Sequence, residues 1–165
     1  MVEFAFYVAG TVALFSSVMV VISTNPVHAL LYLVLSLLAV ATVFFTLGAP
    51  FAGALEVIVY AGAIMVLFVF VVMMLNLGKK TADQERKWLK ASGWIGPAVL
   101  ALILLVELVF LLTPMRHMPA IGSAVIDAKQ VGIALFGPYL LAVELASTLL
   151  LAGLVAAYHL GRHDD

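Results

Sequence analysis

The sequence predicts an all-α integral membrane protein with five transmembrane helices, and three observations lead to this fold class. Hydrophobic residues make up 65% of the 165 residues, charged residues make up only 10%, and the mean hydropathy is +1.23. A soluble domain has about 25% charged residues and could not bury this much apolar surface. No Asp, Glu, Lys or Arg occurs between Glu3 and Glu56. The apolar runs also lack the period of two that is typical of a membrane β-barrel.

A membrane-spanning helix needs about 20 mainly apolar residues. We treat residues 1–165 as a single transmembrane domain in which five segments meet this requirement. The predicted helices cover residues 4–23, 28–47, 51–77, 94–112 and 135–159. The first segment follows a start without a basic region, so we expect a retained helix and not a cleaved signal peptide.

Small residues and turn residues indicate how the first three helices pack. Ala5, Ala9, Ala13 and Ser17 recur every four residues, and such a ridge allows another helix to approach closely in lipid. Asn25 suits an N-cap and Pro26 suits the first helical position after it. Gly48-Ala49-Pro50 separates the second helix from the third in the same way. Because both connections are short, we expect the first three helices to be sequential antiparallel neighbours.

Basic residues predict the orientation. Five of them lie between the third and fourth helices: Lys79, Lys80, Arg86, Lys87 and Lys90. Only Arg116 and Lys129 lie between the fourth and fifth. Cytoplasmic loops carry the excess of Lys and Arg, so residues 78–93 are expected in the cytoplasm. With five spans, the N-terminus then lies outside and the C-terminus lies in the cytoplasm.

The third helix is unusual in length and in content. At 1.5 Å per residue, residues 51–77 would reach about 40 Å, against a hydrocarbon thickness of about 30 Å. Tilt, extension into the cytoplasm or an irregularity such as a π-bulge must absorb the excess. Glu56 and Tyr60 are four residues apart and share a face of a regular helix, and Gly62 follows them. The competing interpretation is that Tyr60 and Gly62 only serve close packing between helices.

Glu56 is the first candidate for a function. An ionisable group in a membrane costs roughly 2.5–3.5 kcal/mol on insertion scales and is a functional candidate for that reason. It could reach toward water at the outer end of its helix. The alternative is a protonatable group that faces an internal hydrated path, where burial disfavours the charged carboxylate.

Two further acids lie in the predicted spans, and no Lys or Arg lies in any span to pair with them. Glu107 lies near the outer end of the fourth helix and could reach the membrane surface. Glu144 lies near the middle of the fifth helix, so we expect it to face protein or internal water and not lipid. A protonated, hydrogen-bonded packing role is the competing interpretation of Glu144.

Several classes of function are disfavoured. The net charge of −1 gives no reason to expect nucleic acid binding, and the absence of cysteine excludes Cys-ligated iron–sulfur clusters and disulfides in this chain. The four histidines lie at helix ends or in loops, where no pair is placed to ligate haem or a metal: His28, His117, His159 and His163. No phosphate-binding loop and no nucleophile–base arrangement is present.

Two blocks of sequence closely resemble a known family. The first combines residues 25–32 (NPVHALLY) with residues 51–77, and the second combines residues 132–139 (GIALFGPY) with residues 144–152 (ELASTLLLA). These blocks resemble subunit J of bacterial respiratory NADH:quinone oxidoreductase, complex I. The resemblance covers roughly residues 1–78 and 132–160. Residues 79–131 match weakly, so no role is carried onto Glu107.

The resemblance implies a multi-pass subunit in the membrane arm of the complex, in the bacterial inner membrane. It implies neighbours named A, H and K, and extends the partners to the antiporter-like chains L, M and N. FMN, the iron–sulfur clusters and quinone would belong to other subunits, and this chain would hold no cofactor and no catalytic residue. Members of the family carry a π-bulge in the third helix whose rotation is associated with a water path for protons. That bulge corresponds here to Tyr60, Ala61, Gly62, Ala63 and Val66.

The resulting hypothesis is a noncatalytic subunit of a proton-translocating oxidoreductase. A switchable third helix would couple quinone reduction to proton translocation, with Glu56, Tyr60 and Glu144 in the proton path or in coupling. Two alternatives stay open. One is a scaffold that only fills the membrane arm, and the other is a subunit of a multisubunit cation/proton antiporter.

Overall fold

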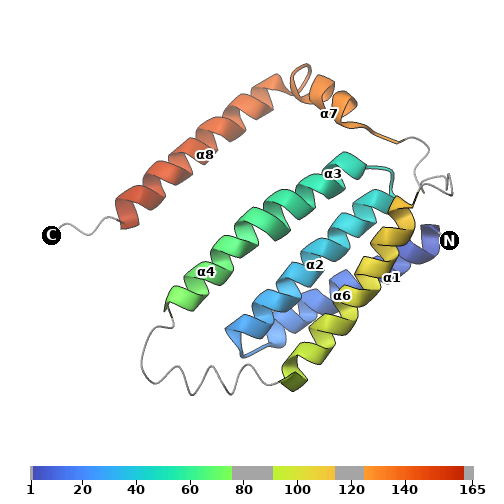
Figure 1. Cartoon of the computed structure of the whole chain (residues 1–165). Helices are drawn as coiled ribbons and strands as arrows, with labels where there is room; N and C mark the ends of the chain where they lie inside the picture. The colour runs from blue at the N-terminus through green and yellow to red at the C-terminus, as the bar shows by residue number, and fades with distance from the viewer. Residues whose placement is uncertain (1, 76–90, 114–124, 162–165) are drawn as a thin grey trace. The chain divides into compact units, whose positions relative to one another are not determined.

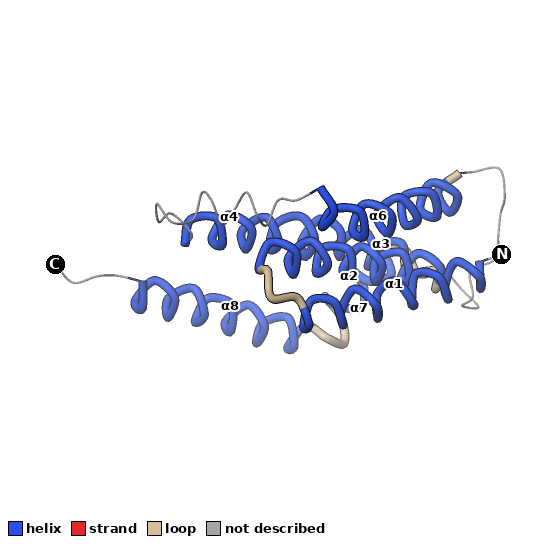
Figure 2. The backbone as a smooth tube through the Cα atoms, turned by 90° about the horizontal axis from the view of Figure 1, so that it is seen from below, coloured by secondary structure: helices blue, strands red, loops and turns tan. Residues whose placement is uncertain are grey.

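The computed structural model describes residues 2–75, 91–113 and 125–161, and every regular element within these ranges is a helix (Figure 2). Five of the described helices are long and apolar enough to cross a membrane: Val2–Ile22, Pro26–Thr46, Pro50–Val72, Trp94–Leu112 and Leu140–Gly161. The predicted all-α membrane fold with five spans is therefore confirmed. The orientation of the termini stays a prediction, because the basic residues that predict it lie mostly outside the described ranges. The chain divides into two compact units, residues 1–125 and 126–165.

The first unit is built around its second helix. α1 (Val2–Ile22) is joined to α2 (Pro26–Thr46) by three residues, and the two helices pack along each other (Figure 1). The Asn25 side chain accepts a hydrogen bond from the backbone N–H of Val27 at 2.9 Å, and Pro26 is the first helical residue. The predicted cap is therefore confirmed, and it starts α2 two residues earlier than predicted.

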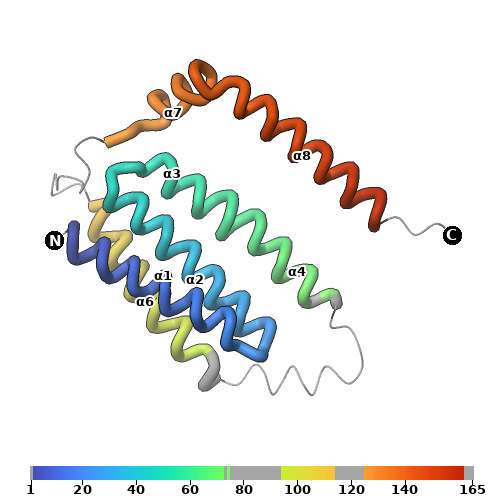
Figure 3. The backbone as a smooth tube through the Cα atoms, turned by 180° about the vertical axis from the view of Figure 1, so that it is seen from behind, coloured from blue at the N-terminus to red at the C-terminus, as the bar shows by residue number. Residues whose placement is uncertain are grey.

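The third span follows α2 after a tight turn. Gly48 adopts a φ of 82°, a left-handed conformation that glycine tolerates and other residues rarely adopt. The span begins at Pro50 and comprises α3 (Pro50–Leu55), η1 (Glu56–Ile64) and α4 (Met65–Leu75). Figure 3 follows these three elements as one continuous helix. The predicted last residues of this span, 76 and 77, lie outside the described residues.

α6 (Ala91–Leu112) completes the first unit and packs against α2 and α1. The core lies where α1, α2 and α6 meet, and its members are Val12, Tyr32, Leu35, Ala39 and Leu104. α2 supplies most of the core because it is the helix that touches all the others in this unit. Four hydroxyl residues of α1 and α2 are also buried: Ser16, Ser36, Thr42 and Thr46.

The second unit departs from the single helix predicted over residues 135–159. It contains α7 (Ala128–Leu135) and α8 (Leu140–Gly161), separated by a four-residue turn. Pro138 has no N–H to donate and disfavours helical geometry in the residue before it, which explains the break. Asp127 and Gln130 form a capping box that starts α7 before the predicted span.

Candidate functional site

The middle of the third span is a π-helix. It covers nine residues, Glu56–Ile64, and connects smoothly to α-helical segments on both sides. The backbone N–H of Met65 donates to the carbonyl oxygen of Tyr60, five residues earlier, as π geometry requires. π-Helical geometry is rare and usually occupies a single turn, frequently at functional sites. A π segment of this length inside an apolar span is therefore the most distinctive local feature of the molecule.

Glu56 is the first residue of this π segment. Its backbone is helical, with a φ of −57° and a ψ of −45°, and its N–H donates to carbonyl oxygens of the preceding α3 turn. The side chain is partly buried. Glu56 thus lies where the hydrogen bonding changes from four-residue to five-residue spacing.

Tyr60 lies within the π segment, with half of its surface exposed. Hydrogen bonds in a π-helix join residues five apart, so a π turn is longer than the four residues that separate Glu56 from Tyr60. The point directly above Glu56 on the next turn therefore lies between Tyr60 and Ala61. The two predicted proton-path residues of this span therefore lie one turn apart but are offset around the helix. We find no hydrogen bond between them among the described contacts.

Gly62 allows the backbone to close up within the π segment. A Cβ atom built on Gly62 would lie 3.1 Å from the carbonyl oxygen of Val57, five residues earlier. Ala61 and Ala63 flank it inside the same segment. Val66 lies beyond the π segment, in α4, because the five-residue hydrogen bonding ends before it.

A small cavity adjoins the π segment. It has a volume of about 340 Å³ and is lined by residues of α2, η1 and α6. Val57 is the only described lining residue that η1 contributes. The sequence could not predict that Val57 lines a cavity, because Val57 is one apolar residue within an apolar run. The cavity leaves space into which side chains of η1 can move.

Gly53 fixes the approach of the third span to α2. It is buried in α3, three residues before Glu56. A Cβ atom there would lie 3.0 Å from the carbonyl oxygen of Ala41 and 3.0 Å from the ring of Phe45. This contact holds the N-terminal end of the third span against α2 and so positions the start of the π segment.

Glu144 belongs to the second unit, and the structure corrects its predicted position along the helix. Because α8 begins at Leu140, Glu144 lies in the second turn of this helix and not near the middle of the span. The side chain is exposed, and the hydroxyl of Ser147 donates to the backbone carbonyl of Glu144 at 2.8 Å. Within the described ranges, no three or more His, Asp or Glu side chains gather as a metal site would require.

The fold and the π segment together define a class: a polytopic α-helical membrane protein with a specialised third span. Comparison with known proteins gives the family. Residues 16–160 match the family described as NADH-ubiquinone/plastoquinone oxidoreductase chain 6, and the chain belongs to this family.

The sequences of its relatives align with this chain over most of their length. A protein of Pseudomonas aeruginosa, named NADH-quinone oxidoreductase subunit J, is 65% identical over 162 residues that cover 98% of each chain. A protein of the same name from Escherichia coli K12 is 62% identical over 162 residues, which cover 98% of this chain and 88% of the relative. A third, from Buchnera aphidicola subsp. Schizaphis graminum, is 52% identical over 160 residues, which cover 97% of this chain and 98% of the relative.

Proposed function

We propose that this chain is a membrane-arm subunit of a proton-translocating NADH:quinone oxidoreductase. Its family and the names of its relatives support membership of that complex. The five membrane-spanning helices support a multi-pass location, which in a bacterium is the inner membrane. The expected neighbours are the other membrane subunits, A, H and K first, with the antiporter-like chains L, M and N further along the arm.

The redox chemistry of such a complex is assigned to its other subunits. FMN, the iron–sulfur clusters and quinone need thiolate ligands or binding pockets, and this chain has no cysteine to ligate a cluster. The contribution of this chain is the coupling of quinone reduction to proton movement. The observation that carries this proposal is the π segment that opens at Glu56 inside a membrane span.

The coupling step is a change of the third span between π and α geometry. A π hydrogen bond spans one residue more than an α hydrogen bond. When the π segment becomes α-helical, the helix beyond it therefore rotates by about 100° for each residue by which the hydrogen bonding shifts. Tyr60, Ala61, Gly62 and Ala63 lie in the part that would change, and Val66 lies in the part that would rotate. The cavity of about 340 Å³ beside Val57 offers space for side-chain movement during this change.

Glu56 lies at the start of the π segment and Tyr60 lies within it, so the change in geometry would alter the position of Tyr60 relative to Glu56. We assign to Glu56 the exchange or polarisation of protons along internal water, with Tyr60 as a hydroxyl partner in that path. Glu144, on α8, is assigned to electrostatic support or packing against a neighbouring subunit. A lipid-facing acid would be costly, so both acids are expected to be sheltered by protein or water in the assembled complex.

Two measurements test the proposal. Copurification with NADH dehydrogenase and quinone-site chains is expected, whereas recovery with antiporter chains alone would show the antiporter alternative to be correct. In the assembled complex, Glu56→Gln should lower the number of protons pumped per electron while NADH still reduces quinone. Glu3→Gln, an exposed acid of α1, is the matched control and should leave pumping unchanged. Normal pumping in Glu56→Gln, with a loss of assembled complex only, would favour the scaffold alternative.

A further inference from the structure

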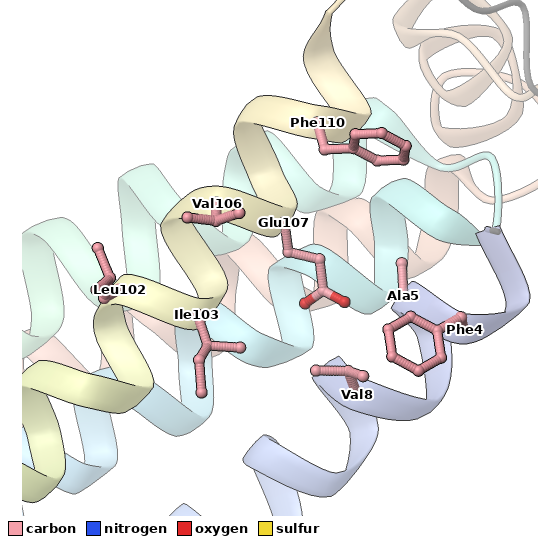
Figure 4. A pocket seen from close by; sticks show the side chains of 8 residues that line it. All are labelled: Phe4, Ala5, Val8, Leu102, Ile103, Val106, Glu107 and Phe110. Carbon is pink, nitrogen blue, oxygen red and sulfur yellow. The ribbon is translucent and has the colours of Figure 1, made fainter.

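A second, larger cavity lies between α1 and α6, away from the π segment. It has a volume of about 600 Å³ and is lined by three residues of the first two turns of α1 and by five residues of α6. Seven of the eight lining residues are apolar, and Glu107 is the exception (Figure 4). Its volume falls within the range of roughly 300–1,000 Å³ that is typical of small-molecule sites.

Glu107 places one carboxyl group in this apolar groove. Figure 4 shows its side chain extending from α6 toward α1, where Phe4, Ala5 and Val8 face it. The Oε2 atom is buried and accepts no hydrogen bond from any described residue. An acceptor in apolar surroundings is costly to leave unpaired, so the groove is chemically incomplete without a donor.

The groove lies at the end of the helices where a membrane surface would be. α1 begins at Val2 and α6 ends at Leu112, so both helices terminate beside it. Glu107 precedes the end of α6 by five residues, or about 8 Å along the axis. A donor in the head-group region can reach this depth, and the apolar lining continues inward from it.

We propose that this groove binds a phospholipid whose head group carries a primary ammonium. The ammonium donates to the Glu107 carboxylate, and an acyl chain lies along the apolar side chains of α1 and α6. A charge-assisted hydrogen bond of this kind is stronger than a neutral one, and it removes the cost of the unpaired oxygen. A phospholipid of the same chains without an amine lacks the donor that Glu107 requires.

The lining favours a lipid over a helix of another subunit. Close helix pairs in membranes use small residues at their interface. The groove instead carries Phe4 and Phe110 at its α1 and α6 sides, with 73% and 44% of their surfaces exposed. Flexible acyl chains can pass between such large side chains, whereas a rod about 10 Å wide cannot approach the helix axes closely.

The test uses the purified full-length chain in phosphatidylcholine nanodiscs. Photoactivatable phosphatidylethanolamine and photoactivatable phosphatidylglycerol with identical chains are added separately, and the labelled peptides are mapped by mass spectrometry. We expect phosphatidylethanolamine to label residues 4–8 and 102–110 about tenfold more than phosphatidylglycerol, the ratio for one charge-assisted hydrogen bond. Equal labelling by the two lipids would overturn the proposal.

Two variants and one control locate the effect. Glu107→Gln should reduce phosphatidylethanolamine labelling to the phosphatidylglycerol level, whereas Glu3→Gln, an exposed acid in the first turn of the same α1, should not. Val106→Trp keeps the carboxyl group but fills the groove, and it should abolish labelling there by both lipids. Unchanged labelling in either Glu107→Gln or Val106→Trp contradicts the site. A photo-cross-link from position 106 to another protein chain in the assembled complex would assign the groove to a partner helix instead.

Discussion

The hydroxyl groups of Ser17 on α1 and Ser36 on α2 lie 2.9 Å apart and join the first helix pair. Ser36 also donates to the carbonyl oxygen of Ala13 at 3.3 Å. Because the Ser36 hydroxyl has one proton, both hydrogen bonds form together when Ser36 donates to Ala13 and accepts from Ser17. Ser36 therefore makes both side-chain hydrogen bonds that connect α1 with α2, and Ser17 makes one of them.

Ser36→Ala is expected to destabilise the helix pair more than Ser17→Ala. Hydrogen bonds between membrane helices contribute about 0.6 kcal/mol on average and up to about 1.7 kcal/mol. Loss of both bonds should therefore lower the free energy of unfolding by about 1–2 kcal/mol, and loss of one by about half as much. The measurement is equilibrium unfolding in mixed detergent micelles. Thr11→Val is the control, because the Thr11 hydroxyl is exposed and bonds only to Tyr7 of its own helix. An equal loss in all three variants would contradict this account.

Gly53→Ala should separate the third span from α2. The added methyl group would meet the Ala41 carbonyl and the Phe45 ring, both at 3.0 Å, and a backbone carbonyl cannot rotate away. Overpacking of this kind costs about 1–3 kcal/mol in the free energy of unfolding. Gly10→Ala is the matched control, since a Cβ atom there meets nothing within 4 Å.

In Gly10→Ala, the better helix propensity of alanine should leave stability unchanged or raise it by up to about 1 kcal/mol. The yield of assembled complex should follow the same order in cells, with Gly53→Ala the lower of the two. A Gly53→Ala protein as stable as wild type would mean that α2 and α3 can shift apart freely.

The number of spans and the cap at Asn25 could be predicted from the sequence, because run length and cap chemistry are local properties. The buried face of α1 could be predicted only in part. The expected ridge included Ala5 and Ala9, but the buried stripe continues through Val12 and Ser16. A strict four-residue row drifts around a helix of 3.6 residues per turn, so contact with α2 alternates between spacings of four and three.

In the candidate site, too, local features could be predicted from the sequence and features set by packing could not. The excess length of the third span and the position of Gly62 indicated an irregularity, but no local pattern marks its start at Glu56 or its extent to Ile64, where the span packs against α2. The predicted position of Glu144 near the middle of its helix was wrong, because that position depends on where the turn at Pro138 ends. The partly buried position of Glu107 toward α1 required the packing of two helices distant in sequence, which no local pattern contains.

Gly96→Ala is expected to lower the free energy of unfolding less than Gly53→Ala, because the atom that the new methyl group meets can move more easily. A Cβ atom at Gly96 would lie 2.6 Å from the hydroxyl oxygen of Tyr32, the tip of a side chain and not a backbone group. We expect a loss of about 1 kcal/mol in the free energy of unfolding, at the lower end of overpacking costs. Removing that oxygen in Gly96→Ala/Tyr32→Phe should restore most of the loss, which a double-mutant cycle in micelles measures. Additive effects of the two changes would show that the hydroxyl is not the obstacle.

Gly62→Ala tests the proposed π-to-α change directly. The new methyl group would lie 3.1 Å from the Val57 carbonyl oxygen, a contact that exists only while the two residues are paired across a π turn. A cost of about 1 kcal/mol to the π form alone would shift the population about fivefold toward the α form. Isotope-edited infrared spectroscopy with a labelled Val57 carbonyl measures that shift, and coupled proton pumping should slow while uncoupled electron transfer persists. Gly153→Ala in α8, with nothing within 4 Å, should change neither. A labelled carbonyl band that moves while pumping per electron stays constant would separate the helix change from proton coupling and refute the proposed switch.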